Sequence, residues 1–313
     1  MRKTEIVTVN LNPCIDWVCI VPEYTHGGLN RVRRVRSDVA GKGINVAVAL
    51  KNLGLEPLCV GFNFSENGFL LTEKLDALGV RHDFIETDGA IRVNMKLYEE
   101  STDIMTEINQ PGAFASEEIQ TKLLKKIKSL DSEKGILVLS GSRPEGVAAD
   151  FYAQICKLWS GKIFLDTEGE ALKCALETGL SFALKPNLYE IESTFGVICS
   201  NSAEIVSFCR EKLFVGKVKV ICVSMGKDGA VLVTRDNAFF CPALNVQAKG
   251  LAGAGDAMVA GLVYAIVKNL SEEEFLPTAM ATAAASVILE GTQMCTLEGF
   301  TNMLKIMPEI TRI

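Results

Sequence analysis

Short apolar runs rich in β-branched residues alternate with helix-like segments along most of this chain. The strand-like runs span 6–9, 58–62, 136–139, 163–165, 218–223 and 230–233, and the helix-like segments span 44–53, 69–78, 119–130, 151–159 and 203–213. Continuous apolar strands separated by helices are typical of a parallel sheet that is covered on both faces. The sequence therefore predicts an α/β fold built on a mostly parallel sheet.

Two regions interrupt this alternation. Residues 15–21 and 29–37 resemble strands with no helix between them, and residues 91–98 and 103–109 resemble a hairpin. Apolar and polar residues alternate from Ile91 to Tyr98, so one face of this strand is expected to be polar. We interpret these segments as a small, mostly antiparallel β lid. The predicted lid takes residues 11–37 and 91–109, and the α/β core takes residues 1–10, 38–90 and 110–313.

The composition argues against several classes of protein. With 313 residues, 48% of them hydrophobic, the chain can bury one large core and is not expected to be disordered. Its formal net charge of −6 gives no general attraction to nucleic acid or to anionic membranes. No apolar run approaches the roughly 20 residues of a membrane span. Ten cysteines without a C-x-x-C pair favour free thiols in a reducing compartment, so we predict a cytoplasmic protein.

The segment Gly253-Ala254-Gly255-Asp256 precedes a long apolar, helix-like run. Small residues let backbone N–H groups crowd together at the start of a helix, which forms an anion site. An aspartate there lies beside a bound phosphate and can accept a proton from an attacking hydroxyl. That arrangement suits a small-molecule kinase. The alternative is a glycine turn in which Asp256 is an ordinary first-turn acid favoured by the helix dipole.

Several predicted strands end in small or polar residues, and the carboxyl ends of parallel strands form the ligand crevice in such sheets. Asp16 follows the first strand and can bind sugar hydroxyls there, or else be a solvated turn residue. The glycine loop Gly41-Lys42-Gly43 leads into a helix with Asn45 near its start, a pattern that is more often structural than functional. Neither a Walker A loop nor a G-x-G-x-x-G pattern occurs, which argues against the P-loop and dinucleotide-binding classes.

Further candidate residues are charged or amide side chains. Arg31 belongs to a dense basic run, and Arg92 shares a strand face with Lys96. Such runs are usually solvated, although a guanidinium suits a phosphate group through its paired N–H donors. Asn187 and Glu190 have the spacing of a capping box at a helix start, and the alternative is that Glu190 orders water around Mg²⁺. Residues 224–230 are either a hairpin turn or the wall of a nucleotide pocket.

In this order along the chain, these motifs resemble those of the ribokinase-like sugar kinases of the phosphofructokinase-B type, in the branch of 1-phosphofructokinase and tagatose-6-phosphate kinase. The matching segments are Asn12-Pro13…Asp16, Gly41-Lys42-Gly43-Ile44-Asn45, Arg92-Val93-Asn94-Met95-Lys96, Leu139-Ser140-Gly141-Ser142, Asp166-Thr167, Lys185-Pro186-Asn187…Glu190, Ser224…Gly226…Gly229-Ala230 and Gly253-Ala254-Gly255-Asp256. Each segment is weak evidence by itself, but the full set in register is specific.

The resemblance implies a three-layer α/β core with a β lid, often used for dimerisation, and ATP with Mg²⁺ as the phosphoryl donor. It assigns catalysis to Asp256 and to an anion hole made by Gly253, Ala254 and Gly255. It implies sugar-hydroxyl contacts at Asp16, Gly41 and Asn45, the substrate phosphate near Lys42, Arg92 and Ser142, and Arg31 reaching the site of a partner subunit. It implies the nucleotide near Lys185, Asn187, Ser224, Gly226 and Gly229, and Mg²⁺ near Glu190 through water.

The sequence therefore predicts an ATP-dependent kinase that converts fructose 1-phosphate to fructose 1,6-bisphosphate. Tagatose 6-phosphate is the alternative substrate, because Arg92 and Lys42 indicate a phosphate group but not its carbon. An alternative of another class is a sensor of the same fold that binds sugar phosphate and nucleotide without turnover. Leu251 and Ala252 motivate this alternative, because the family usually has a threonine before its G-A-G-D segment. Neither nucleic acid nor a membrane is expected as a partner.

Overall fold

The computed structural model describes residues 5–250 and 252–313. Its main element is a ten-stranded sheet with the order β14-β13-β12-β11-β10-β9-β8-β1-β4-β5. These strands are β1 (Ile6–Asn10), β4 (Pro57–Phe64), β5 (Arg81–Thr87), β8 (Ile136–Ser140), β9 (Lys162–Asp166), β10 (Ala183–Leu184), β11 (Val220–Ser224), β12 (Ala230–Val233), β13 (Ala238–Cys241) and β14 (Thr311–Arg312). Neighbours from β5 to β11 are parallel, and β12, β13 and β14 add an antiparallel edge. The predicted α/β fold with a mostly parallel sheet is confirmed.

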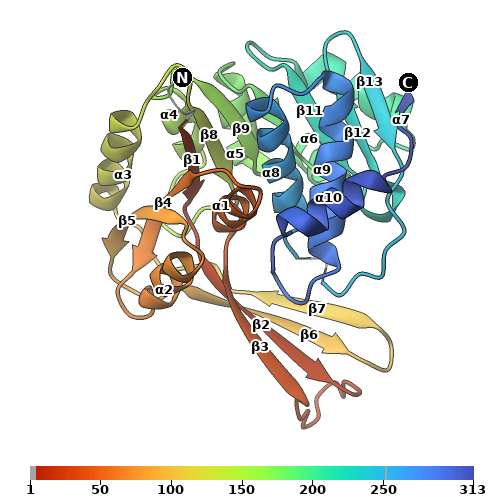
Figure 1. The fold of residues 1–313 in the computed structure, drawn as a ribbon. Helices are drawn as coiled ribbons and strands as arrows, with labels where there is room; N and C mark the ends of the chain where they lie inside the picture. Colours follow the sequence, from red (N-terminus) through yellow and green to blue (C-terminus); the bar gives the residue numbers. More distant parts are fainter. Residues whose placement is uncertain (1–4, 251) are drawn as a thin grey trace.

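Helices cover both faces of this sheet (Figure 1). One face carries α1 (Lys42–Asn52), α8 (Ala254–Val267) and α9 (Glu272–Val287), with α10 (Leu297–Lys305) packed on α9. The other face carries α3 (Glu117–Ser129), α4 (Phe151–Cys156), α5 (Gly169–Glu177), α6 (Leu188–Phe195) and α7 (Ser202–Phe208), which a π-helix, Cys209–Leu213, extends. Helix α2 (Phe69–Ala77) packs against β5 and the lid.

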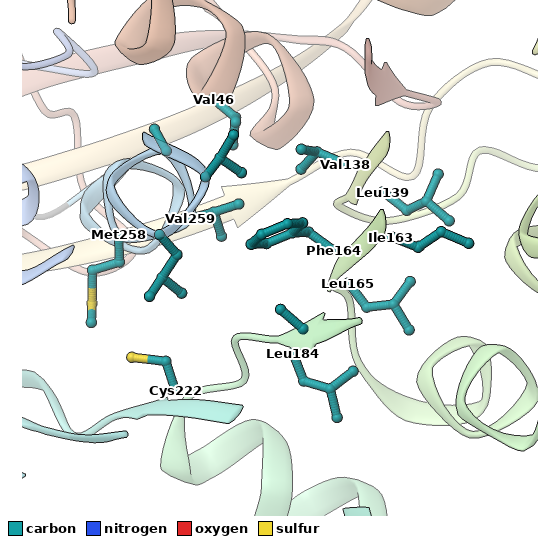
Figure 2. Close-up of a cluster of buried hydrophobic side chains, with 14 of the residues drawn as sticks. Val46, Val138, Leu139, Ile163, Phe164, Leu165, Leu184, Cys222, Met258 and Val259 are labelled. Atoms are coloured by element: carbon teal, nitrogen blue, oxygen red, sulfur yellow. The ribbon is translucent and has the colours of Figure 1, made fainter. Parts of the chain in front are cut away.

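The core forms because the central strands are apolar on both faces. Every residue of β1 and β8 is buried, and successive side chains point to opposite sides of the sheet. Figure 2 shows Val138 and Phe164, neighbours on β8 and β9, pointing toward Val259 of α8. Leu139 and Leu165, the next pair along these strands, point to the opposite face. Continuous apolar runs are therefore what a sheet between two helical layers requires.

Helix α8 lies in close contact with α9, and a glycine makes that contact possible. Thr282 Oγ of α9 donates to the carbonyl of Ala257 at 2.8 Å, which ties the two helices together. A Cβ at Gly261 would lie only 2.7 Å from Cα of Ala279 and 3.0 Å from the carbonyl oxygen of Thr278. Because backbone atoms cannot move aside as side chains do, only glycine fits at this crossing. The crossing fixes the direction in which the N-terminus of α8 points.

The lid is a separate four-stranded sheet with the order β3-β2-β6-β7. Its strands are β2 (Cys14–Val21), β3 (Arg34–Ala40), β6 (Arg92–Glu99) and β7 (Ile104–Asn109), and Figure 1 shows them extending away from the core. β2 pairs with β6 in parallel, and the outer pairs are antiparallel. The expected lid sheet is confirmed, but the strand predicted at 29–37 was misplaced, since β3 begins at Arg34 and continues to Ala40. Residues 29–33 form an exposed connection between β2 and β3 instead.

Two further findings concern the helices and the cysteines. None of the helices in residues 5–250 and 252–313 is long and apolar enough to cross a membrane. The ten cysteines are free thiols, and all of them except Cys174 are buried. The apolar strand positions of Cys59, Cys222 and Cys241 explain this burial, because a thiol packs there as a small apolar side chain.

Candidate active site

A cavity of about 1320 Å³ lies between the lid and the carboxyl ends of the central strands. The lid strands β2, β6 and β7 line one side of it, and the first turn of α1 lines another. The remaining wall comes from the segments that follow β10 and β11, from the loop at 243–248, and from α8 and α9. Segments far apart in the sequence therefore meet here, as expected for the carboxyl edge of a doubly wound sheet.

Asp256 lies in the first turn of α8 and lines the cavity. Its Oδ2 accepts a hydrogen bond from Asn45 Nδ2 of α1 at 2.7 Å, and the carboxylate is only 5% exposed. Gly253 caps the helix with φ +86° and provides no side-chain cap, which leaves the first backbone N–H groups of α8 without intrahelical partners. These donors and the helix dipole favour an anion beside Asp256.

The surroundings of Asp256 change its acidity. Burial first, and then repulsion by the nearby Asp166 carboxylate, raise the pKa of Asp256 to about 6. Lys42, Asn45 and Lys185 oppose this rise without cancelling it. A carboxylate with such a pKa is mostly ionised at neutral pH and still basic enough to accept a proton in a reaction. A carboxylate in this environment can act as a general base.

Two lysines and two further carboxylates form a network next to Asp256. Asp166, at the end of β9, is 1% exposed and lies 3.2 Å from Nζ of Lys185 and 3.5 Å from Nζ of Lys42. Lys42 Nζ also lies 3.3 Å from Oε1 of Glu190. Burial works against the ionised form of Asp166, yet Lys185 and Lys42 hold its pKa below the ordinary value. Burial likewise lowers the pKa of Lys42, but Asp166 and Glu190 outweigh it and raise that pKa, so Lys42 stays charged beside the cavity.

Asn187 and Glu190 form the predicted capping box at the start of α6. Glu190 N–H donates to Asn187 Oδ1 at 2.7 Å, and Asn187 N–H donates to Glu190 Oε2 at 2.9 Å. Both side chains also line the cavity, and Glu190 directs its other oxygen at Lys42. The structural and the functional interpretations of this motif are therefore compatible, since one carboxylate oxygen caps the helix while the other faces the site.

The lid presents a polar face to the cavity. Asp16 is 4% exposed, and its two oxygens accept hydrogen bonds from Lys96 Nζ at 2.8 Å and from Asn94 Nδ2 at 3.2 Å. Arg92, on the same face of β6, donates to the backbone carbonyl of Gln110 at 2.9 Å, and its buried Nε has no partner among the described residues. The alternating pattern of residues 91–98 correctly predicted this polar face.

Most of the candidate residues named from the sequence line this one cavity. They are Asp16, Gly41, Lys42, Asn45, Arg92, Lys185, Asn187, Glu190, Ser224, Gly226, Gly229, Gly253, Ala254, Gly255 and Asp256. Ser142 and Arg31 are not among the lining residues. Ser142 accepts a hydrogen bond from Asn12 Nδ2 at 3.2 Å, and Arg31 is exposed in the connection between β2 and β3. Ala252 lines the cavity, whereas Leu251 lies outside the described residues.

Several residues that shape the site have no recognisable role in the sequence. Asp166 was seen only as part of a matching segment, since a lone acid after a strand does not reveal that two lysines converge on it. Lys96 was seen only as a neighbour of Arg92, because its partner Asp16 lies 80 positions away in the sequence. The apolar wall from α9, which includes Met280, Ala284 and Val287, resembles any other buried helix face in sequence.

The lining of the cavity suits a nucleotide and a magnesium ion. Phosphate oxygens fit the N-terminus of α8 with the nearby ammonium groups of Lys42 and Lys185, and the apolar wall of α9 fits a nucleobase. Within the described ranges no group of three His, Cys, Asp or Glu side chains could hold a metal ion. A Mg²⁺ ion at this site would therefore take its ligands mainly from phosphate oxygens and water, as this ion usually does.

Comparisons with known proteins agree with this geometry. The model of the pfkB family carbohydrate kinases matches residues 4–298. A 1-phosphofructokinase of Bacillus subtilis is 34% identical over 98% of this chain and 100% of that protein, and one of Borreliella burgdorferi is 33% identical over 96% of each. The solved structure of phosphofructokinase-2 from Escherichia coli in complex with substrates and products superposes with a TM-score of 0.91 at 26% identity, covering 97% of this chain and 99% of that one. This chain belongs to the pfkB family of carbohydrate kinases, and it is an ATP-dependent carbohydrate kinase.

Proposed function

We propose that this kinase transfers the γ-phosphoryl group of ATP to fructose 1-phosphate and produces fructose 1,6-bisphosphate. The observation that carries the proposal is the meeting of two sites in one cavity: Asp256 at the N-terminus of α8, and Arg92 on the polar face of the lid. A reacting hydroxyl beside Asp256 and a phosphate group against the lid require a substrate that carries both. The two relatives at 33% and 34% identity bear the name 1-phosphofructokinase, which favours the 1-phosphate.

In this proposal Asp256 binds the acceptor hydroxyl and takes its proton as the new phosphate ester forms. Asn45 holds the carboxylate in position through its hydrogen bond of 2.7 Å. The backbone N–H groups of Gly253, Ala254 and Gly255 stabilise the charge on the transferring phosphoryl group, because such donors are already oriented before the reaction. Positioning and electrostatic stabilisation supply most of the rate in phosphoryl transfer.

The resemblance implies that Lys42 lies near the phosphate of the sugar, but Lys42 and Lys185 both contact Asp166, so in this proposal both lysines face the phosphates of the nucleotide. Asp166 fixes both ammonium groups from the buried side, so each points toward the cavity with little freedom. When bound, Mg²⁺ neutralises charge on the phosphate oxygens. Glu190 would hold water around that ion, and Ser224, Gly226 and Gly229 would border the nucleotide, since all four residues line the cavity. Closure of the lid over the cavity excludes water and limits hydrolysis of ATP.

Arg92 binds the phosphate group that the sugar already carries. Its guanidinium is the strongest candidate on the lid, because no carboxylate pairs with it among the residues described. This contact would hold tagatose 6-phosphate as well as fructose 1-phosphate, so tagatose 6-phosphate remains the second candidate substrate. The intact Asp256 argues against a sensor without turnover.

An ADP-release assay with a panel of acceptors separates these functions. The panel contains fructose 1-phosphate, tagatose 6-phosphate, fructose 6-phosphate, free fructose and a blank without sugar. The proposal predicts the highest kcat/KM for fructose 1-phosphate and poor use of free fructose. A preference for tagatose 6-phosphate would favour the second candidate, and binding of sugar phosphate and ATP without ADP release would favour the sensor. A preference for free fructose would contradict the phosphosugar assignment altogether.

We also propose that two copies of this chain associate through the outer face of the lid. Trp17, Met95 and Ile108 lie side by side across β2, β6 and β7 on the face opposite Asp16, and they are 42%, 37% and 58% exposed. An apolar row of this kind is uncommon on a free surface. The solved structures include a tetrameric form of phosphofructokinase-2 from Escherichia coli, at 26% identity.

Sedimentation velocity tests this association. Wild-type protein should sediment as a dimer, and Ile108→Lys should sediment as a monomer, because a charge is costly to bury at the centre of the row. Ile198→Lys is the matched control, since Ile198 is 84% exposed between α6 and α7. A monomeric wild-type protein would contradict the proposal.

A further inference from the structure

Lys96 is a buried cation whose hydrogen-bonding capacity is only partly used. It lies on β6 in the lid, it is 6% exposed, and it lines the cavity. Its ammonium group has three N–H donors. In the described part of the chain it donates only to Oδ2 of Asp16, at 2.8 Å. The other donors of this ammonium are therefore available to a molecule in the cavity.

The stability of the fold does not by itself explain this ion pair. Both side chains are at least nine-tenths buried, at 8% and 5% exposure, so each charge has lost most of its solvation. Well-packed apolar side chains of the same size usually stabilise a fold as well as a buried ion pair does, or better. Asp16 also has a second partner, Asn94, so the lid holds this carboxylate in one orientation. Such a rigid, polar arrangement in a cavity wall suits recognition of a ligand.

The neighbouring charges indicate which part of a ligand Lys96 meets. Asp16 neutralises Lys96 at 2.8 Å and would repel a phosphate dianion that approached the pair. Arg92 has no such carboxylate, and it lies four positions away on the same strand face, about 13 Å along an extended strand. The two cations therefore address different parts of one sugar phosphate. A neutral hydroxyl suits the Lys96–Asp16 pair, because it can accept from the ammonium and donate to the carboxylate at once.

We propose that Lys96 is a specificity-determining residue that, together with Asp16, binds a ring hydroxyl of the ketose phosphate. Lys96 donates to the oxygen of this hydroxyl, and Asp16 accepts its proton in a hydrogen bond. Arg92 holds the phosphate group at the other end of the substrate. This inference rests on the proposed function, since it names the residues that distinguish the sugar within that same site. A substrate without the hydroxyl leaves the remaining hydrogen-bonding capacity of the buried Lys96–Asp16 pair unused, and a site built to bind a hydroxyl rejects such a substrate.

The test compares wild type and one variant, each with the substrate and two altered forms of it. KM and kcat are measured for wild type and Lys96→Met with fructose 1-phosphate and with its 3-deoxy and 4-deoxy analogues. For wild type, one analogue should raise KM at least about tenfold, as loss of a charge-assisted hydrogen bond does. For Lys96→Met, KM for fructose 1-phosphate should rise similarly, the same analogue should add less than about threefold, and KM for ATP should stay unchanged. A residue with only a structural role would weaken the binding of all three sugars equally.

Two controls keep the result interpretable. Lys122→Met removes the same side chain from an exposed ion pair with Glu118 on α3, and it should leave every constant unchanged. If Lys96→Met does not fold, the double variant Asp16→Asn/Lys96→Met removes both buried charges and takes its place in the comparison. The inference fails if wild type has the same KM for both deoxy analogues as for fructose 1-phosphate. It also fails if the increase in KM caused by the analogue is as large in Lys96→Met as in wild type. Turnover of fructose 1-phosphate by wild type tests the proposed function separately. If wild type prefers another ketose phosphate, that ketose phosphate and its deoxy analogues are used in the comparison.

Discussion

If Asp256 is the general base, its pKa determines how kcat falls at acidic pH. Its pKa is raised to about 6 by burial and by Asp166, so its ionised fraction falls about tenfold for each pH unit below 6. We expect kcat to be level above pH 7 and to fall with this slope below pH 6. Measurement of kcat from pH 5 to pH 8 tests this expectation. A kcat that stays level down to pH 5 would mean that the pKa of the general base is not raised.

Asp256→Asn tests the same role by removal of the base. The variant should lower kcat at least about 10²-fold, the usual range for loss of a general base. ATP binding should persist, because the backbone donors of Gly253 to Gly255 remain. Calorimetric titration of ATP with Mg²⁺ provides the control for an intact nucleotide site. Near-normal turnover by the variant would exclude Asp256 as the base.

The same substitution should also stabilise the fold, and this effect should depend on pH. The pKa of Asp256 is about 6 in the folded protein and has a reference value of 3.8, so the folded state loses stability as the carboxyl ionises between about pH 4 and pH 6. Asp256→Asn does not carry this cost. Relative to wild type it should gain roughly 1–3 kcal/mol at pH 7.5 and little at pH 4. Urea unfolding at both pH values measures the difference, and an equal change at both would contradict the assigned shift.

Arg92→Ala tests whether Arg92 binds the sugar phosphate and not ATP. Loss of a guanidinium–phosphate contact should raise KM for fructose 1-phosphate by about tenfold or more, while KM for ATP changes little. Steady-state kinetics with each substrate varied in turn gives both constants. Equal increases in the two constants would mean that Arg92 supports the lid through Gln110 and does not bind the sugar phosphate.

At the scale of the elements, Gly261 controls the position of α8 and therefore of Asp256. In Gly261→Ala the added methyl group would lie 2.7 Å from Cα of Ala279, so α8 and α9 must separate. We expect a loss of about 1–3 kcal/mol in the free energy of unfolding, together with a lower kcat. Gly299→Ala in α10 is the matched control, because its methyl group would meet Thr296 Oγ at 3.2 Å and otherwise only Ala285 at 3.6 Å. A Gly261→Ala protein as stable as this control would show that the crossing can relax.

The elements that could be predicted from sequence are those whose burial is uniform. β1 and β8 are buried along their whole length, so their apolar runs identified them directly. β5, at the edge of the sheet, has no fully buried residue and begins with three polar residues, and β10 has only two residues, so neither shows a recognisable apolar pattern. For the site, the Gly253–Asp256 segment was recognisable because its chemistry is local. The roles of Asp166 and Lys96 depend on partners brought together by folding, and no local pattern records them.

At the scale of the whole molecule, the core and the lid face each other across one cavity, and we propose that the core binds the nucleotide and the lid binds the sugar phosphate. The core contributes Asp256 and the two lysines fixed by Asp166, and the lid contributes Arg92 and the Lys96–Asp16 pair. Neither half contains a complete site. In the proposed function both halves therefore hold one substrate at the same time, with the polar face of the lid directed at the core.

Phosphorus NMR of the complete reaction tests this account most directly. Wild-type protein is mixed with ATP, Mg²⁺ and fructose 1-phosphate, and the phosphorus signals are followed to completion. The account predicts ADP and an equal amount of a new phosphomonoester signal, that of the 6-phosphate of fructose 1,6-bisphosphate, with almost no inorganic phosphate. ADP that appears with inorganic phosphate and without a new phosphomonoester, or no ADP at all, would contradict transfer to the sugar phosphate.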